Sequence, residues 1–305
     1  MMHTRFFCML SSLPVISVKV QNGTEYSPTV NGPLRERDVR HMIYIVPKPT
    51  DTPDDNSTGA VMRELEKADA RYGVLDLGEV DPLDSGLENE LIWVCGIRQD
   101  GHQFETLNVL SLTNRVINTP ASIVACASKV MTTALLLANN VRTPDTAYTR
   151  SEERAREFLL RHKKIVYKPL YGYDGNGIRL VTEPGELGPG PWYLQEYVKN
   201  DRDFRVFVLG GEAVGAIARI SDTLMHNIHQ GGTGMAVAID EEMRAVAEAA
   251  AAAIGIDYCG VDLLLDRGGY TVLEVNGTPN WHCMAAPIPN LLARYLIERE
   301  REMRA

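Results

Sequence analysis

Residues 258–279 read YCGVDLLLDRGGYTVLEVNGTP. Two apolar runs, 258–265 and 270–275, flank a glycine-containing turn, and this pattern predicts an antiparallel β-hairpin. If residues 267–269 form a three-residue loop, Asp262 lies directly opposite Glu274. Asn276, two residues further on, then projects from the same face. The stretch therefore predicts a rigid hairpin that holds two acids and an amide side by side.

These three side chains form a candidate metal site. Two carboxylates within cross-strand distance repel one another unless a cation lies between them, and the local sequence offers no neighbouring Lys or Arg. Oxygen ligands on a rigid hairpin suit magnesium, with manganese as the alternative, rather than zinc. We therefore predict Asp262, Glu274 and Asn276 as metal ligands. The competing interpretation is a pair of acids on the wet face of an ordinary hairpin.

The rest of the chain reads as mixed helix and sheet. From residue 42, strands alternate with a helix near 58–71, which predicts a small open α/β sheet over residues 42–118. Later helices are expected at 121–139, 151–162 and 241–254, the last with an Asp240 N-cap and a Gly255 stop. Further strands are expected at 192–198, 204–209 and 213–220, and an amphipathic helix closes the chain.

Two lysines and a glycine loop form a candidate anion site. Lys129 interrupts the apolar face of the predicted helix 121–139, and Lys168 ends a strand before the loop Gly172–Gly177. Glycines let backbone N–H groups approach phosphate closely. The loop matches neither GxxxxGK[ST] nor GxGxxG, so an ordinary turn and a snorkelling lysine stay open. Residues 195–198 are either a linker whose backbone pairs with an adenine edge or a plain edge strand.

Composition excludes several classes of protein. The 305 residues carry 31 Lys and Arg against 40 Asp and Glu, a net charge of -9, so we expect neither nucleic acid nor membrane as a partner. Five scattered cysteines without CxxC predict reduced thiols and a cytoplasmic chain. Residues 1–41 make a poor export signal and read as an irregular extension. A zinc site is a weaker hypothesis, because its candidate ligands have no further partner at ligand spacing. Those candidates are His226, His229, His282 and Cys283.

The order of these parts resembles the ATP-grasp superfamily, specifically the RimK-type carboxylate-amine ligases. Besides the lysines, the glycine loop and the hairpin, the resemblance rests on Gln-Glu-Tyr-Val at 195–198, Asp-Phe-Arg-Val-Phe-Val at 203–208 and Asn-Ile-His-Gln-Gly-Gly at 227–232. It covers about residues 117–300. It implies an ATP-grasp fold, in which an N-terminal open α/β domain (42–118) precedes two α+β subdomains (119–196 and 197–305) that clasp ATP. The implied reaction transfers the γ-phosphate to a substrate carboxylate, and an amine then attacks the acyl phosphate to form an amide.

The resemblance also implies roles for individual residues. The lysines contact ATP phosphates, the 195–198 linker holds adenine and an aspartate binds the ribose. The residues so assigned to ATP are Lys129, Lys168, Gln195, Glu196, Tyr197, Val198 and Asp203. Polar groups near the phosphates and the reacting carboxylate are the implied catalytic residues Arg205, Arg219 and Asn227. The implied magnesium ligands are the three that the hairpin pattern already indicates.

The substrate is less defined than the reaction. Many relatives have Arg where this chain has Gln230, which removes a cation that could hold an anion. The Asn-Gly-Thr-Pro segment and the loop at 226–232 are most similar to glutamate ligases that act on archaeal coenzymes such as tetrahydromethanopterin. We therefore expect L-glutamate and a small-molecule carboxylate as substrates. A deazaflavin coenzyme or a protein C-terminus are alternative acids, a non-catalytic nucleotide-binding regulatory module is an alternative of another class, and a homo-oligomer stays open.

Overall fold

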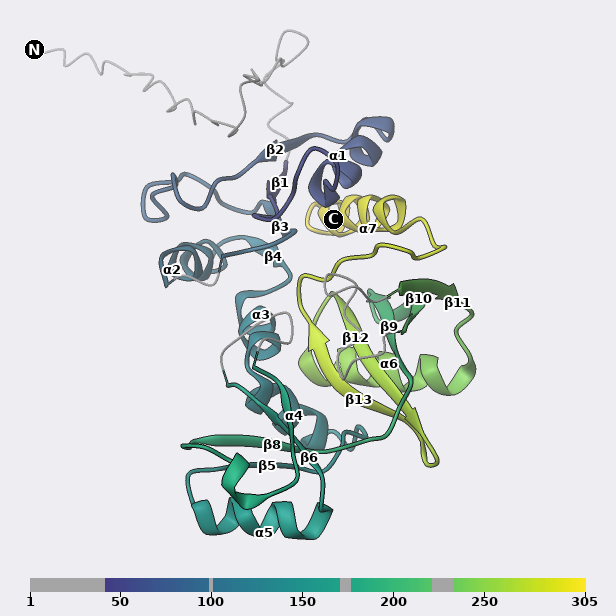
Figure 1. Ribbon diagram of the computed structural model, residues 1–305. Helices are drawn as coiled ribbons and strands as arrows, with labels where there is room; N and C mark the ends of the chain where they lie inside the picture. The colour runs from purple at the N-terminus through teal and green to yellow at the C-terminus, as the bar shows by residue number, and fades with distance from the viewer. Residues whose placement is uncertain (1–41, 99–100, 171–176, 221–232) are drawn as a thin grey trace, which may run out of the picture.

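Three β-sheets organise the residues that the computed structural model describes, which are 42–98, 101–170, 177–220 and 233–305 (Figure 1). The first sheet is parallel and has the order β2-β1-β3-β4. Its strands are β1 (Ile43–Val46), β2 (Tyr72–Val74), β3 (Leu91–Val94) and β4 (Arg115–Ile117). With α1 (Ser57–Lys67) and α2 (Gly101–Leu110), it is the open α/β sheet that the alternating pattern predicts.

The C-terminal helix α7 (Ile288–Glu302) packs on this first sheet. It contacts α1, and its buried Leu292 and Leu296 share one apolar core with Ile45 and Trp93 of the sheet. The same core includes Phe207, from the part of the chain that forms the last sheet. The amphipathic helix expected at the end of the chain is therefore present, and it packs against α1 and the first sheet (Figure 1).

The helix expected over 121–139 is wrong as a single element. The chain instead forms α3 (Pro120–Ala127) and α4 (Lys129–Ala138), which are bent by 104° at Ser128. Ser128 has extended backbone dihedrals, and its hydroxyl accepts the Met131 N–H as the N-cap of α4. Lys129 consequently begins a helix. No single helix among the described residues is long and apolar enough to cross a membrane, and the bent pair passes only by length and composition.

The second sheet is antiparallel and has the order β5-β8-β6-β7. Its strands are β5 (Thr146–Thr149), β6 (Ile165–Lys168), β7 (Arg179–Val181) and β8 (Trp192–Glu196). Helix α5 (Glu152–His162) covers one face, where Phe158 and Leu159 pack on Leu194 in a cluster that these elements and the segment before β8 form by themselves. The strand expected to run to Val198 ends two residues earlier, at Glu196.

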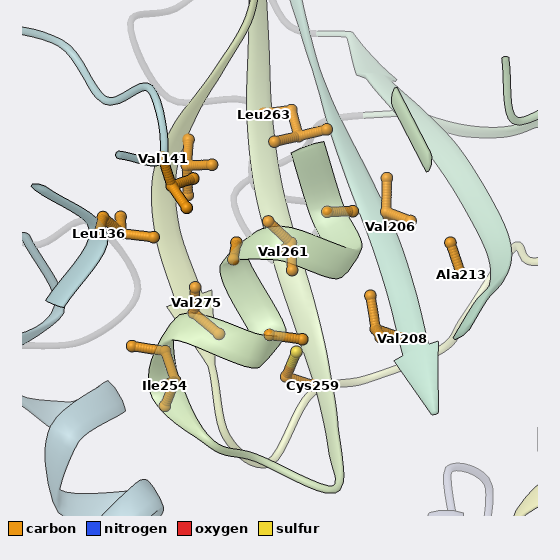
Figure 2. Packing of buried hydrophobic residues seen from close by; sticks show 14 of the residues in the cluster. Leu136, Val141, Val206, Val208, Ala213, Ile254, Cys259, Val261, Leu263 and Val275 are labelled. Carbon is orange, nitrogen blue, oxygen red and sulfur yellow. The ribbon is translucent and has the colours of Figure 1, made fainter. Parts of the chain in front are cut away.

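The third sheet is antiparallel and has the order β11-β10-β9-β12-β13. Its strands are β9 (Arg202–Leu209), β10 (Glu212–Ile220), β11 (Thr233–Val237), β12 (Tyr258–Asp266) and β13 (Gly269–Asn276). Helix α6 (Glu241–Ile254) lies across one face, where Val206, Val261 and Val275 point toward it (Figure 2). As predicted, Asp240 caps this helix and Gly255, in the left-handed region, ends it.

The hairpin of β12 and β13 differs from the expected one at its tip. The turn holds two residues, so Asp266 pairs with Gly269, whereas a three-residue loop was expected. A β-bulge then adds one residue, Leu273, to β13. This shifts the register by one, and Asp262 lies opposite Glu274 as predicted. The conclusion was correct although the loop from which it was derived was wrong.

Candidate functional site

A row of charged side chains crosses the face of the third sheet that lies opposite α6. Asp203 and Arg205 are two residues apart on β9 and so share a face. Their direct cross-strand partners are Arg219 on β10 and Asp262 on β12, and Glu274 on β13 pairs with Asp262. Four strands thus bring together two arginines and three acids that are distant in sequence.

Two bidentate ion pairs and a bridge connect this row. Arg205 donates from Nε and Nη2 to the two oxygens of Asp262 at 2.7 and 2.8 Å. Arg219 donates from Nε and Nη2 to the two oxygens of Asp203 at 2.6 and 2.9 Å, and its Nη2 also lies 2.9 Å from Asp262 Oδ2. Arg219, Asp203 and Asp262 are buried, at 3%, 5% and 3% exposure. The expectation that the hairpin acids lack a neighbouring Arg is therefore wrong, because the arginines come from other strands.

The two hairpin acids have opposite electrostatic environments. Burial favours the neutral form of Asp262, but Arg205 and Arg219 outweigh it and hold the pKa of Asp262 well below its usual range. Burial and the charge of Asp262 raise the pKa of Glu274, although Lys168 and both arginines oppose this. Glu274 is therefore the carboxylate whose charge is less well compensated, and a cation beside it would stabilise its ionised form.

One of the two predicted phosphate-contacting lysines, Lys168, lies near Glu274. Lys168 is the last residue of β6, and Lys129 is the first residue of α4. Burial lowers the pKa of Lys168, with Lys129 adding to the effect, while Glu274 and Asp262 oppose it. The structure thus brings a cation of the second sheet close to the hairpin acids, and Lys129 lies near that cation.

The oxygen donors of the hairpin suit magnesium. Asp262 and Glu274 are directly opposed, and Asn276 lies opposite Gly260 on the same face. Asn276 donates from Nδ2 to the Gly260 carbonyl at 3.3 Å, which leaves its amide oxygen as an acceptor. Two carboxylates and an amide oxygen form the hard donor set that magnesium prefers.

The residues expected to bind adenine and ribose lie in β8, in the segment after it and in β9. Gln195 is buried inside the second sheet, where its Nε2 donates to Thr146 Oγ1 at 3.2 Å. Glu196 ends β8, and the Tyr197 ring lies 4.0 Å from the Lys164 ammonium. The Val198 carbonyl accepts from Asn200 Nδ2 at 2.7 Å. Both oxygens of Asp203 accept hydrogen bonds from Arg219.

Several expected residues lie outside the described part of the chain. They are Asn227, His226, His229, Gln230 and all of the Gly172–Gly177 loop except Gly177. Of the zinc candidates, His282 Nε2 lies 3.1 Å from Asp55 Oδ1, and Cys283 is exposed. Within the described ranges no group of three or more His, Cys, Asp or Glu side chains could hold a metal ion. The zinc hypothesis therefore gains no support there.

Two residues that follow strands of the first sheet contact the hairpin or the segment after it, and these contacts were not predicted from the sequence. Asn118, fully buried just after β4, donates from Nδ2 to the carbonyls of Tyr258 and Gly277 at 2.8 and 2.7 Å, and its Oδ1 accepts the Tyr258 N–H. Lys48, just after β1, donates from Nζ to the Asn280 side chain. Both follow strands of the parallel sheet, and ligands bind outside the carboxyl ends of such strands. That rule is the signal that could have found them.

Comparison with known proteins assigns the family. The RimK-like ATP-grasp domain model matches residues 126–298. The tetrahydromethanopterin:alpha-L-glutamate ligase of Methanocaldococcus jannaschii is 32% identical over 219 residues, which make up 66% of this chain and 74% of that protein. The chain belongs to the RimK-like ATP-grasp family. Human beta-citrylglutamate synthase B is 32% identical to this RimK-like chain over 179 residues, 53% of this chain and 46% of that protein.

Solved structures confirm the fold of this RimK-like ligase. The ATP-grasp ligase PsnB, complexed with a minimal precursor, superposes with a TM-score of 0.70 at 19% identity, and covers 86% of this chain and 99% of its own. PsnB complexed with the precursor, Mg and ADP gives a TM-score of 0.68. The expected ATP-grasp fold and carboxylate-amine ligase class are confirmed, and the chain is an enzyme of the ATP-grasp glutamate ligase family.

Proposed function

We propose that this chain uses ATP and magnesium to join L-glutamate to a carboxylate of a tetrahydromethanopterin-type coenzyme. The single observation that carries the proposal is the row Arg219–Asp203–Arg205–Asp262–Glu274, which gathers charge where phosphoryl transfer needs it. Similarity to tetrahydromethanopterin:alpha-L-glutamate ligase supports the pterin acid, and both relatives described above have glutamate in their names. A deazaflavin coenzyme and a protein C-terminus are the alternative acids.

The charges of the site suit an acyl-phosphate route. In phosphoryl transfer the protein mainly positions the reactants and neutralises charge. Lys129 and Lys168 are proposed to hold the ATP phosphates, while Arg205 and Arg219 are proposed to orient the substrate carboxylate toward the γ-phosphate. The carboxylate oxygen attacks the γ-phosphorus, the bond to the ADP oxygen breaks and an acyl phosphate forms. An amine then attacks the acyl carbon, the C–O bond to phosphate breaks and an amide, phosphate and a proton are released. None of these steps needs a covalent enzyme nucleophile.

Magnesium is proposed to bind at Glu274, Asp262 and Asn276, where it would neutralise phosphate charge. Because Arg205 and Arg219 already pair with Asp262, the ion would share that carboxylate with them. Glu274 is the acid whose pKa burial raises, so it stands to gain most from the ion. PsnB, a protein with this fold, has been solved with Mg and ADP, which supports the pairing of metal and nucleotide.

The first experiment tests the reaction and its substrate. The full chain is incubated with ATP, magnesium and L-glutamate against a panel of tetrahydromethanopterin, a deazaflavin coenzyme, citrate and a peptide acid. The expected result is a mass increase of one or more glutamyl residues on tetrahydromethanopterin, with ADP released only when acid and amine are both present. ATP binding without ADP release against every acid would instead support the non-catalytic regulatory module.

A substitution then tests the metal site. Glu274→Gln should abolish ADP release, and it should raise the magnesium concentration needed for half-maximal nucleotide binding by at least about tenfold. Glu302→Gln, on the exposed side of α7, is the matched control and should behave as the unsubstituted chain. Full turnover by the Glu274→Gln variant would contradict the proposed role of this acid.

A further inference from the structure

The strand order of the first sheet reverses between β1 and β3. After β1 the chain goes to β2 on one side of β1, and it later returns to β3 and β4 on the other side. In open α/β sheets, ligands bind outside the carboxyl ends of the strands at such a reversal. Lys48 is the second residue after β1, and Gly96 is the second residue after β3.

The absence of a side chain at Gly96 leaves room for Lys48 at this reversal of strand order. A Cβ added to Gly96 would lie 2.8 Å from Lys48 Cγ and 3.0 Å from Lys48 Cα. The second contact is to backbone, so any larger residue would have to displace the chain itself. The aliphatic part of the Lys48 side chain consequently packs on the backbone of Gly96, where the loops after β1 and β3 are in contact and only glycine leaves room.

Lys48 extends from this reversal toward the segment that follows β13. Its Nζ donates to Asn280 Oδ1 and lies 3.5 Å from the Thr278 carbonyl oxygen, in the segment that follows the proposed metal ligand Asn276. Burial lowers the pKa of Lys48 and Arg205 lowers it further, while Cys95, Asp51 and Asp55 oppose this. Lys48 and Arg205 are thus two cations that approach one place from two different sheets.

The charge of Lys48 is not neutralised by a close carboxylate. Within residues 42–98, 101–170, 177–220 and 233–305, the Lys48 ammonium donates to a carbonyl oxygen and to an amide oxygen, both neutral. The nearby Asp51 accepts the Ser57 and Thr58 N–H groups at 2.9 and 3.0 Å and so caps α1. A half-buried ammonium with neutral partners, beside a second cation, is an environment that favours an anionic ligand.

We propose that Lys48 binds a carboxylate of one of the two acidic substrates and holds it beside Arg205. The inference rests on the proposed ligase function and adds to it a residue that lies outside the family match at 126–298. The carboxylate belongs either to the acid that is activated or to L-glutamate. In both cases Lys48 acts on binding of the acidic substrate, whereas Lys129 and Lys168 act on ATP.

The test is a kinetic comparison of substituted full-length chains. Lys48→Gln removes the charge but keeps a donor for Thr278 and Asn280, Lys48→Met removes both, and Lys48→Arg restores the charge. Lys67→Met, at an exposed position on α1, is the control. Initial rates are measured while ATP, L-glutamate and tetrahydromethanopterin are varied in turn. Equilibrium binding of each acid beside a non-hydrolysable ATP analogue gives a second measurement that needs no turnover.

The expected result is a rise of at least about tenfold in KM and Kd for one acid with both Lys48→Gln and Lys48→Met, while KM for ATP changes less than about twofold. The acid that responds identifies whose carboxylate Lys48 binds, and Lys48→Arg should recover most of the loss. Unchanged affinity for both acids, or a fall in kcat alone, would overturn the proposal. Lys48 would then have only a structural role, in its contacts with Thr278 and Asn280. Loss of binding is measured without product, so failure of the ligase proposal remains distinguishable from failure of this one.

Discussion

Asp262 is the residue on which the charged row depends. It accepts from Arg205 at 2.7 and 2.8 Å and lies 2.9 Å from Arg219, although Arg205 is 57 positions away in the chain. Buried ions are costly unless their partners compensate them, and removing one partner leaves the others uncompensated. Asp262 therefore has a structural function as well as its proposed place beside magnesium.

Asp262→Asn should lower the free energy of unfolding by about 3 kcal/mol, because the buried Arg219 and the partly buried Arg205 lose a charged acceptor. Urea unfolding monitored by circular dichroism measures this loss. Asp266→Asn, which breaks a more exposed pair with Arg142, is the matched control on the same hairpin and should cost at most about 1 kcal/mol. Equal losses in the two variants would show that the buried pairs contribute no more than a surface pair.

The pH dependence of stability follows from the same carboxylate. Its pKa in the folded chain lies well below the unfolded value of about 3.9, so the ionised form stabilises the fold above about pH 4. That contribution is lost as the pH falls below this value. Asp262→Asn should therefore flatten the acid-side decline in stability, and an unchanged slope would contradict the assigned ion pairs.

At this scale the sequence predicted the acids and missed their partners. Alternation within one hairpin is enough to place Asp262 and Glu274 on a common face. The arginines belong to other strands, and only the pairing order β10-β9-β12 brings them beside Asp262. Local periodicity contains no information about that order. Asp203 is a further case, because both its oxygens accept from Arg219 of the neighbouring strand.

At the scale of elements, the break between α3 and α4 determines where Lys129 lies. Helical spacing of apolar residues continues through 121–139, so the pattern predicted one helix. The structure breaks it at Ser128, which caps the second helix through its hydroxyl. Serine competes well for caps and poorly for helix interiors, and the sequence thus contained the signal. Strong periodicity on both sides concealed it.

Ser128→Ala should cost about 1 kcal/mol of stability, as loss of an N-cap does. Because α4 begins with Lys129, the same change should also weaken binding of a non-hydrolysable ATP analogue, measured by isothermal titration calorimetry. Ser151→Ala removes the equivalent cap of α5 and is the matched control. It should lose similar stability with unchanged nucleotide affinity, and equal affinity in the two variants would refute the link to Lys129.

At the scale of the whole molecule, two of the three sheets share a core. The cluster beneath α7 joins the first sheet to Phe207 and Tyr258 of the third, whereas the second sheet packs with α5 in a separate cluster. The sequence predicted α7 as an amphipathic helix but not what it covers. An apolar stripe shows that a helix has a buried face, while its partner depends on the path of the entire chain.

Leu292→Ala and Leu296→Ala should each cost about 3 kcal/mol, because both side chains are fully buried in this shared core. Leu160→Ala, at a position 71% exposed on α5, should change stability by less than about 0.5 kcal/mol. Intrinsic fluorescence reports on the shared core through Trp93 and Trp281. If these tryptophans kept their native signal while the leucine variants unfolded by circular dichroism, the two sheets would not be joined by α7.

The bulge at Leu273 compensates for the short turn, so that the pairing of Asp262 with Glu274 does not depend on turn length alone. A three-residue turn without a bulge and the observed two-residue turn with one both place Asp262 opposite Glu274. The extra residue can therefore lie in the turn or in β13 without changing the pairing of residues 262 and 274. A one-residue change in the length of the turn, matched by loss or gain of the bulge, would thus leave residues 262 and 274 directly opposed.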